Sequence, residues 1–293
     1  DLIATPTVED FQRVDYSIAQ PGDEVGDVGY ALNTMIDNVE TALQARAESE
    51  QRLRQFVADA SHELRTPLAS IQGYTQLLQK GSADEELALA RIASESARMS
   101  GLVEDLLLLA RLDAGRELAS DPVDLIPLAI DAVSDAHAAG PDHEWVLDLP
   151  QFDDEDDVCV SCTVAGDESA LRQVFANLVN NARIHTPAGT RVKVGVQVIG
   201  GGASAPGFVR MSVADDGPGI PPELRATVFD RFVRGDTSRS RQGKGSSGLG
   251  LSIVSSIAEA LGGRVDVDTV CDGEGAPGEH GTTFSVILPA MEL

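Results

Sequence analysis

The feature that most constrains this fold is a long series of apolar residues spaced alternately by three and four positions. It begins with the set Val25, Val28, Leu32, Met35, Val39 and Ala42. This spacing aligns apolar side chains along one stripe of a helix and is typical of a coiled-coil seam. Because a single helix cannot bury such a stripe by itself, the sequence predicts paired long helices from Glu24 to about Arg116.

A second seam follows at Val57, Ser61, Leu64, Leu68, Ile71, Thr75 and Leu78. It is out of step with the first, because continuing the first seam through Leu53 predicts Phe56 and Ala60 instead. Such a slip locally changes the winding of a supercoil. Two interpretations stay open: a helix that signalling can push between two phases, or a harmless irregularity across the weak polar stretch at Arg46 and Ser49.

A third amphipathic stripe predicts a helix from about Ala83 to Ala114, with Ile92, Met99, Leu102, Leu106 and Leu109 on one side. A short turn at residues 81–82 makes these two helices an antiparallel hairpin. One hairpin leaves much of its stripe uncovered, so we expect two chains to pair into a four-helix bundle. His62 follows the seam position Ser61, which places it at the edge of the core and open to solvent.

Beyond a short linker at residues 116–122 the pattern becomes mixed. Helices are expected at 124–139, about 168–184, from 222 and at about 248–261, and strands in EWVLDL, VCVSCTVAG, RVKVGVQVI, FVRMSVAD, RVDVD and TTFSVIL. This order predicts an α/β sandwich, a mixed sheet with helices on one face and water on the other. Gly-rich stretches at 200–207 and 272–281 are expected hairpin tips. The predicted fold class is therefore multidomain α and α+β: a coiled-coil, four-helix dimerisation bundle followed by that sandwich.

Charge and hydropathy exclude some classes of function. The net charge of −25 and the pI near 4.3 argue against nucleic acid as a partner, because its phosphates would be repelled. No run approaches the ~18 apolar residues that cross a bilayer; the block from Leu106 to Ala110 is far shorter. The chain starts at Asp1 without methionine or signal peptide, so we expect the cytoplasmic portion of a longer protein.

The three cysteines, Cys159, Cys162 and Cys271, are interpreted as free thiols. A C-x-x-C pair can bind zinc or carry redox chemistry, but strand alternation in VCVSCTV sends its two cysteines to opposite faces. A structural zinc site also requires four ligands, and no second pair exists. The acidic run at residues 153–157 is interpreted as a solvated turn rather than a calcium site.

The segment SHELRTPL contains His62 on a polar helical face, followed directly by Glu63 and four residues later by Thr66. A histidine can fill a core, bind a metal, act as a base or act as a nucleophile. An adjacent carboxylate can orient and deprotonate an imidazole. These neighbours favour the nucleophile, and the second half of the chain supplies what it would attack.

Four elements in that half suit a nucleotide. Asn177 and Asn181 share a helical face and can hold a hard cation against phosphates. Asp215 ends a strand and can accept a hydrogen bond from an exocyclic amine such as adenine's, while glycines 217 and 219 let the backbone come close. FDRFVRGDTSRSRQGKG is a cationic segment suited to covering a polyphosphate, and GSSGLGL opens a helix whose N-terminus attracts anions.

Together these segments resemble a two-component sensor histidine kinase of the membrane-linked type. GDEVGDVGYALNTMIDNV resembles the second helix of a HAMP signal-relay domain, and FVADASHELRTPLASIQGYTQLL resembles a dimerisation and phosphotransfer domain. NLVNNARIHTP, DDGPGI, FDRF and GSSGLGL resemble the boxes of an ATP-binding catalytic domain. The implied domains are residues 1–50, 51–117 and 118–293.

The resemblance implies that His62 accepts the γ-phosphoryl group of ATP, that Glu63 orients and deprotonates it, and that Thr66 positions water during dephosphorylation of a partner. Asn181 would bind Mg²⁺, with Asn177 at the phosphates. The implied nucleotide site comprises Asn177, Asn181, Arg183, Asp215, Gly217, Gly219, Phe229, Phe232, Gly245, Ser247, Gly248, Leu249 and Gly250. The two phenylalanines would pack at the base of the lid over the nucleotide. Implied partners are a second copy of the chain, the receiver domain of a response regulator and an upstream transmembrane sensor, in a bacterial cell-membrane protein.

Two positions depart from the family pattern. Many relatives carry a lysine three residues after the magnesium asparagine, where this chain has Ile184; phosphate contact from that helix then comes from Arg183 or is absent. Ser246 replaces a glycine common in the last box and is expected to stiffen the lid.

Two alternative functions share part of this motif pattern. ATPases of the same superfamily, such as gyrase, carry a glutamate four residues before the magnesium asparagine to activate water. This chain has Asn177 there, which cannot act as a base, so water attack is disfavoured. A catalytically off dimeric scaffold or phosphatase is the other alternative, and intact His62, Glu63, Asn181 and Asp215 argue against it.

Overall fold

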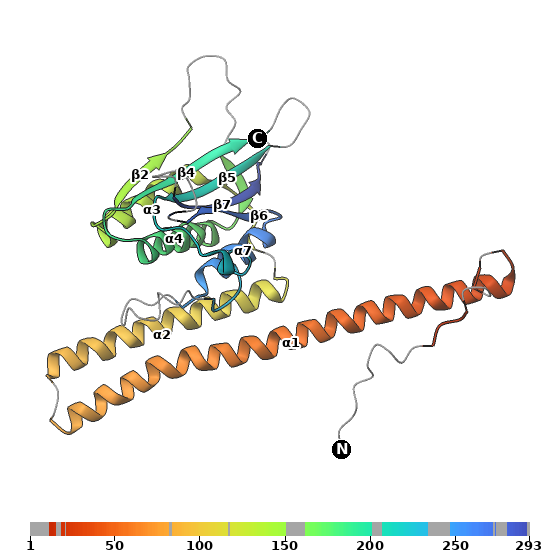
Figure 1. Ribbon diagram of the computed structural model, residues 1–293, viewed down its shortest axis with the longest axis horizontal. Coiled ribbons are helices and arrows are strands. Elements are labelled where there is room, and N and C mark those ends of the chain that lie inside the picture. Colours follow the sequence, from red (N-terminus) through yellow and green to blue (C-terminus); the bar gives the residue numbers. More distant parts are fainter. Residues whose placement is uncertain are drawn as a thin grey trace, which may run out of the picture. The chain divides into compact units, whose positions relative to one another are not determined.

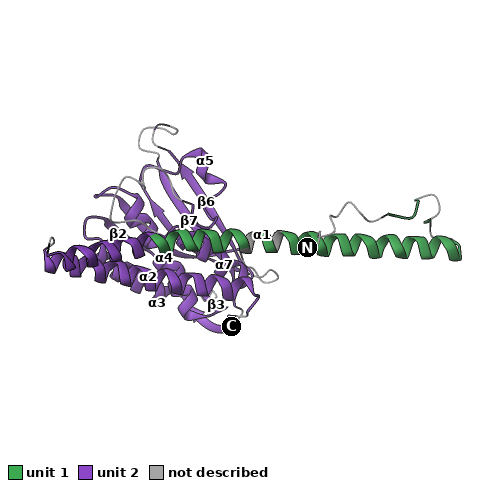
Figure 2. Cartoon of the chain, turned by 90° about the horizontal axis from the view of Figure 1, so that it is seen from below, with its two compact units in different colours: residues 1–65 green, residues 66–293 purple. Residues whose placement is uncertain are grey.

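The structure is a computed structural model. It describes residues 12–15, 19–20, 22–81, 84–116, 118–150, 162–200, 207–233, 247–271, 273 and 280–291, with the side chains of all of these except residues 48, 49, 52 and 53. Internal contacts divide the chain into two compact units, residues 1–65 and residues 66–293 (Figure 2). Within these described ranges, none of the helices has both the length and the hydropathy to cross a membrane.

Helix α1 runs without a break from Glu24 to Gln79 and passes from one unit into the other (Figures 1 and 2). Asp23 stabilises its start, because its Oδ1 accepts a hydrogen bond from the Gly26 N–H at 2.7 Å. Gly81 follows its end with a φ of 63°, a conformation that glycine adopts without steric cost. The long helix predicted from Glu24 is confirmed, and both out-of-step seams lie on it.

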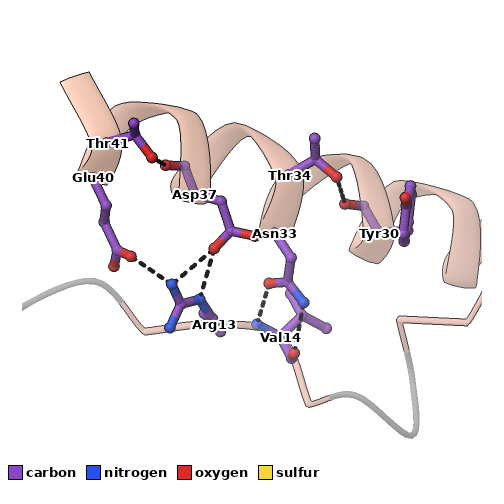
Figure 3. Close-up of polar contacts among 8 residues, drawn as sticks. All are labelled: Arg13, Val14, Tyr30, Asn33, Thr34, Asp37, Glu40 and Thr41. Carbon is purple, nitrogen blue, oxygen red and sulfur yellow. Dashed lines mark hydrogen bonds and ion pairs between the residues drawn. The ribbon is translucent and has the colours of Figure 1, made fainter. Parts of the chain in front are cut away.

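In the first unit, the segment of residues 12–15 lies beside α1 (Figure 3). The Asn33 side chain accepts from the Val14 N–H at 2.9 Å and donates to the Val14 carbonyl at 3.0 Å. Arg13 pairs with Asp37 on the next turn at 2.8 Å. Asn33 thus bonds both backbone groups of one residue, as a neighbouring β-strand would.

Glycines on α1 allow the chain before it to approach closely. A Cβ atom at Gly29 would lie 3.1 Å from the Cα of Ala19, and one at Gly26 would collide with the carbonyl of Gln20. Such contacts exclude any side chain at these two positions without movement of the backbone.

Helix α2 spans Glu85–Asp113, close to the predicted range. Asp84 caps it by accepting from the Leu87 N–H at 3.0 Å. Along α2 only Ala88, Leu102 and Leu109 are buried, and α2 contacts helix α7 (Gly250–Ala260) of the α/β part. Six of the other large apolar side chains of residues 66–113 are more than 40% exposed in the single chain: Leu68, Leu77, Leu87, Leu89, Val103 and Leu107.

The α/β part contains a five-stranded mixed sheet with the order β2-β4-β5-β7-β6 (Figure 1). Its strands are β2 (Glu144–Asp148), β4 (Arg191–Ile199), β5 (Phe208–Asp215), β6 (Arg264–Val270) and β7 (Gly281–Pro289). β2 is parallel to β4, and all other neighbours are antiparallel. The pairs β4–β5 and β6–β7 are the predicted hairpins; most of both predicted tips lies outside the described residues.

Three helices cover one face of this sheet: α3 (Leu125–Ala139), α4 (Glu168–His185) and α7 (Gly250–Ala260) (Figure 1). Asp124 and Asp167 cap α3 and α4 through side-chain oxygens. The core between the layers is apolar and includes Leu125, Leu171, Phe175, Val194, Met211, Ile253 and Leu288, all at most 1% exposed. The predicted sandwich is confirmed, because alternation along β5 and β7 directs every second side chain into this layer.

A second, two-stranded sheet was not predicted. It pairs β1 (Asp121–Asp124) with β3 (Thr163–Gly166) in antiparallel register. The end of the predicted linker therefore lies in β1. The motif DPVD is too short to show a period of two, and only Val123 of β1 is buried, so its sequence carries almost no strand signal.

The described cysteines, Cys162 and Cys271, form no disulfide with each other. Cys162 is buried beside β3, and Cys271 follows β6. Cys159 and the acidic run 153–157 lie outside the described residues, so the interpretation of the C-x-x-C pair and of the acidic turn stays a prediction.

Candidate active site

A cavity of about 140 Å³ lies among α2, α4, the start of α7 and the segment after the short helix α5 (Pro222–Arg225). Its lining consists of Asp105, Asn177, Asn180, Asn181, His185, Val228, Val233, Ser247, Gly248, Gly250 and Leu251. Ligand pockets commonly measure about 300–1,000 Å³. The cavity formed by the described residues therefore has the size for one part of a nucleotide, such as its phosphates.

Helix α4 brings the predicted pair Asn177 and Asn181 to this cavity. Both asparagines lie at the edge of the apolar stripe that α4 buries and are themselves half-buried, so their amides border the cavity instead of open solvent. The Nδ2 group of Asn177 is buried and has no hydrogen-bond partner within the described part of the chain. A buried donor without a partner costs about 1–3 kcal/mol, so a ligand oxygen at this point would be stabilising.

The start of α7 supplies the glycines of the predicted last box. Gly248 has a φ of +71°, and a Cβ atom there would lie 2.9 Å from the Cα of Phe232. The Phe232 N–H donates to the Gly248 carbonyl at 2.8 Å, and Phe232 itself has a φ of 61°. A positive φ costs a non-glycine residue about 1–2 kcal/mol. The hydrogen bond to Gly248 helps to offset this cost at Phe232.

The other residues predicted around this box lie in different places. Ser247 and Gly250 line the cavity. Leu249 is fully buried and packs in the core instead. Gly245 lies outside the described residues.

Asp215 stands at the end of β5 and does not line the cavity described above. Its Oδ1 accepts a hydrogen bond from the Gly217 N–H at 2.9 Å. Burial raises the pKa of Asp215 to about 6; backbone hydrogen bonds from Gly217 and Thr282 oppose this rise, and the negative charge of Asp216 adds to it. The carboxyl group is thus placed to accept further hydrogen bonds once ionised.

The glycines after Asp215 fit close contacts on both sides of the loop. A Cβ atom at Gly217 would lie 2.6 Å from the methyl group of Thr186, the residue that caps α4. Gly219 has a φ of +78°, and a Cβ atom there would collide with the backbone at the end of β6. The loop therefore rests against the C-terminal end of the same helix that carries Asn177 and Asn181.

The predicted phenylalanines anchor the segment after α5. Phe229 packs edge-on against Phe284 of β7, with 6.0 Å between the ring centroids. Phe232 crosses Gly248 as described. Val228 and Val233, rather than the phenylalanine rings, line the cavity.

The structure does not bring Arg183 to the cavity. Its guanidinium group donates to Asn180 Oδ1 at 2.7 Å and to the Ala139 carbonyl at 3.3 Å. Its methylene groups lie against Gly140 at the end of α3, where a Cβ atom would be 3.0 Å away. Of the two alternatives left by the sequence, this geometry agrees with the absence of a phosphate contact from Arg183.

His62, Glu63 and Thr66 lie in the middle of α1. His62 and Thr66 are exposed and Glu63 is half-buried. One residue further, Pro67 lies inside the helix, and because proline lacks an N–H it cannot donate the helical bond to the carbonyl of Glu63. The predicted phosphoacceptor is therefore an accessible imidazole next to a locally weakened turn.

Two family models match the chain. Residues 166–292 match the family described as "Histidine kinase-, DNA gyrase B-, and HSP90-like ATPase", and residues 52–115 match the "His Kinase A (phospho-acceptor) domain". The probable sensor histidine kinase TcrY of Mycobacterium tuberculosis is 51% identical over 280 residues, which are 94% of this chain and 54% of that relative. The chain belongs to the sensor histidine kinases.

The chain is also 33% identical over 280 residues to the signal transduction histidine-protein kinase/phosphatase MprB of Mycobacterium leprae, covering 92% of this chain and 48% of MprB. It spans about half the length of the curated relatives it matches. Among solved structures, histidine kinase ThkA in complex with response regulator protein TrrA has a TM-score of 0.61 at 23% identity, covering 85% of this chain and 65% of that chain. That likeness shows the fold, and the family predicted from the motifs is confirmed.

The sequence motifs did not predict two features of the cavity. Asp105 reaches it from α2, and burial, with a smaller effect of the charge of Glu104, raises the pKa of Asp105 to about 6. The only sequence signal is an acidic pair inside the apolar stretch VEDLLLLA. His185 at the end of α4 also lines the cavity, although no role is expected for it from the motifs.

Proposed function

We propose that this chain is an ATP-dependent protein-histidine kinase that phosphorylates His62 and passes the phosphoryl group to an aspartate of a response regulator. The observation that supports it most is the buried, unpartnered amide of Asn177, within the described residues, at a cavity also lined by Asn181 and Gly250. An acceptor-rich anion satisfies such a donor, and a helix N-terminus such as that of α7 favours negative charge.

In this proposal the nucleotide spans two neighbouring places on α4. Asp215, next to the C-terminal end of α4, accepts a hydrogen bond from the exocyclic amine of adenine, and glycines 217 and 219 allow the base to approach the backbone. The phosphates lie at the cavity, where Asn177 donates and Gly248 and Gly250 leave room. Phe229 and Phe232 hold the base of the segment between these places.

Asn181 is the proposed ligand of Mg²⁺, because an amide oxygen suits a hard cation that keeps several waters. When bound, Mg²⁺ neutralises charge on the phosphate oxygens during phosphoryl transfer.

In the proposed phosphorylation step, the γ-phosphoryl group of ATP passes to His62. An imidazole nitrogen of His62 attacks the γ-phosphorus, a nitrogen–phosphorus bond forms, and the bond to the β,γ-bridging oxygen breaks so that ADP leaves. Glu63 accepts the proton from the imidazole. Thr66, one turn further along α1, is assigned to positioning water for dephosphorylation of the partner, and the name of the kinase/phosphatase MprB supports this second activity.

The proposed domains are residues 1–50, 51–117 and 118–293. We infer a homodimer through the second of these, because α1 and α2 expose a series of large apolar side chains in the single chain. Such side chains are stabilised when a second hairpin covers them. A response regulator receiver domain is the proposed acceptor of the phosphoryl group, and the solved complex of ThkA with its response regulator supports this partner.

Residues 1–50 are proposed to be part of a HAMP signal-relay domain in a bacterial cell-membrane protein. The clamp of Asn33 and Arg13 on residues 12–15, and the glycines of α1 that face residues 19–20, support this (Figure 3). They hold the preceding segment along the helix, as a relay between an upstream sensor and α1 requires.

The deciding experiment is incubation of the chain with γ-labelled ATP and Mg²⁺, followed by acid and alkali treatment. Label that survives alkali and is lost in acid is expected, because a nitrogen–phosphorus bond is acid-labile. His62→Gln should abolish the label and keep ATP binding, whereas His137→Gln, at an exposed histidine of α3, should keep both.

Three results would contradict the proposal. Label that persists in His62→Gln would move the acceptor elsewhere. Steady phosphate release without any labelled protein would instead favour the water-hydrolysing ATPase, and bound ATP with neither product would favour the scaffold or phosphatase.

A further inference from the structure

The loop of residues 216–220 is held by the facing ends of β6 and β7. Thr269 accepts a hydrogen bond from the Ile220 N–H at 2.9 Å and donates to the Gly281 carbonyl at 3.1 Å. Gly219 lies so close to the end of β6 that no side chain fits there. This side of the loop is therefore anchored by backbone and hydroxyl groups.

The other side of the loop is anchored by a histidine to which sequence reasoning assigned no role. His280, half-buried and directly before β7, places its Nδ1 2.8 Å from the carbonyl oxygen of Gly217. A carbonyl oxygen can only accept a hydrogen bond, so Nδ1 must carry the proton in this contact. The ring is thus a donor to the loop, whether neutral or charged.

The residue that His280 holds is also the one that orients Asp215. The Gly217 N–H donates to Asp215 Oδ1 at 2.9 Å, while its carbonyl oxygen accepts the hydrogen bond from His280 Nδ1. Gly217 has no side chain to stabilise its orientation, and the methyl group of Thr186 fills the space where one would begin. These two hydrogen bonds consequently set the orientation of residue 217 in the loop.

The geometry points to His280 as a positioning residue for base recognition. By holding Gly217 it keeps an N–H aimed at the carboxylate of Asp215 and so keeps the remaining oxygen available to the base. This inference rests on the proposed function, in which Asp215 reads adenine.

The positioning role of His280 should affect the preference of the site for ATP over GTP. Adenine carries an exocyclic amine where guanine carries a carbonyl oxygen. A well-oriented carboxylate therefore binds adenine and repels guanine, and loss of orientation should weaken ATP more than GTP. A change that only lowers the stability of the domain would affect both nucleotides alike.

The test uses the full 293-residue chain and four variants. His280→Ala removes the donor. His280→Asn restores one, because the Asn Nδ2 lies as many bonds from the backbone as the His Nδ1. His137→Ala is the matched loss of a histidine elsewhere, and Asp215→Asn tests the base-reading role itself. Dissociation constants for ATP and GTP are measured by competition with a fluorescent ATP analogue, and circular dichroism checks folding.

We expect His280→Ala to weaken ATP on the order of 3- to 10-fold, the factor for one net hydrogen bond, with little change for GTP. His280→Asn should recover most of the loss, and His137→Ala should resemble the wild type. Equal weakening of ATP and GTP, or no recovery in His280→Asn, would overturn the positioning role.

The Asp215→Asn variant separates the two levels of the argument. If it weakens ATP while His280→Ala does not, the inference about His280 is wrong and the base-reading role of Asp215 stands. If it leaves ATP affinity unchanged, Asp215 does not read the base, and the positioning role is lost with it.

Discussion

Two carboxyl groups near the nucleotide site have their pKa raised to about 6 mainly by burial, Asp215 and Asp105. Their surroundings differ, because Asp215 receives backbone hydrogen bonds and Asp105 faces a cavity lined by amides. In the proposed function the first must be ionised to bind adenine, whereas the second adds negative charge near the phosphates. Protonation in the same pH range should therefore weaken ATP binding at Asp215 and favour it at Asp105.

For Asp215 we predict that ATP affinity falls as the pH is lowered through about 6, because protonation removes the negative charge and turns one acceptor oxygen into a donor. Asp215→Asn should bind ATP more weakly at neutral pH and lack this part of the pH dependence. The two proteins differ only at this side chain, so the difference between their binding curves isolates the carboxyl group. Parallel curves would contradict the prediction.

For Asp105 the folded chain binds the proton more tightly than the unfolded chain, whose carboxyl has a pKa near 3.8. Its contribution to stability is therefore favourable at low pH and is lost as the pH rises from about 4 to about 6. Asp105→Asn removes this loss, so the variant should unfold at a higher temperature than the wild type at neutral pH.

The same variant should tighten ATP by about 3-fold, as expected for one partly screened repulsion. Glu104→Gln, an equal change of charge at the adjacent exposed position of α2, is the control and should have a smaller effect. Equal effects of the two variants would mean that only net charge matters.

At the scale of elements, glycines allow backbone to lie against backbone in both units of the chain. Gly248 before α7 crosses Phe232, and Gly26 and Gly29 of α1 face the segment before it. Ion pairs connect elements as well: Arg231 contacts Asp113 at the end of α2 at 2.6 Å. Most of the buried apolar side chains, by contrast, lie between the sheet and its three helices. The periodicity of the sequence already predicts their burial.

Gly248→Ala should unfold at a lower temperature and bind ATP at least about 10-fold more weakly, because a Cβ atom would lie 2.9 Å from Phe232 on a segment with φ +71°. Gly262→Ala is the matched control. Gly262 has the same φ of +71° but nothing within 4 Å, so it should show the backbone strain of about 1–2 kcal/mol without loss of ATP. Calorimetry and nucleotide titration measure the two effects.

Asn33→Ala should release the segment of residues 12–15, since it removes both hydrogen bonds to Val14. Hydrogen exchange at the Val14 N–H should accelerate by about 10-fold, corresponding to roughly 1.4 kcal/mol of lost protection. Asn38→Ala, at an exposed position on the same helix, should leave that rate unchanged. Unchanged exchange in Asn33→Ala would show that other contacts hold the segment.

At the scale of the whole molecule, the proposed homodimer covers the exposed apolar side chains of the hairpin with a second copy. Leu68→Glu and Leu107→Glu, at positions 45% and 53% exposed in the single chain, should shift the protein towards monomer in light scattering. ATP affinity should persist, because neither residue lines the cavity. Ile130→Glu, an equally exposed apolar position on α3, should leave the dimer intact; loss of the dimer there too would indicate nonspecific association.

Sequence periodicity predicted the long helices, the hairpin and the sandwich because burial of apolar stripes repeats regularly and over many residues. It did not predict β1, in which only Val123 is buried, or the place of Leu249 in the core rather than at the ligand. For the site, residues close in sequence such as Asn177 and Asn181 could be grouped from their spacing.

The sequence by itself thus determined the family and the kind of fold, since motifs and periods are local properties. Only the tertiary structure decided which distant groups meet: that Asp105 of α2 lines the cavity, that Arg183 bonds to α3 and Asn180 instead, and that His280 holds Gly217. His280 and Gly217 lie 63 positions apart, and their contact exists because β5 and β7 are hydrogen-bonded neighbours. Pairing between distant strands brings such groups together, and no local pattern records which strands will pair.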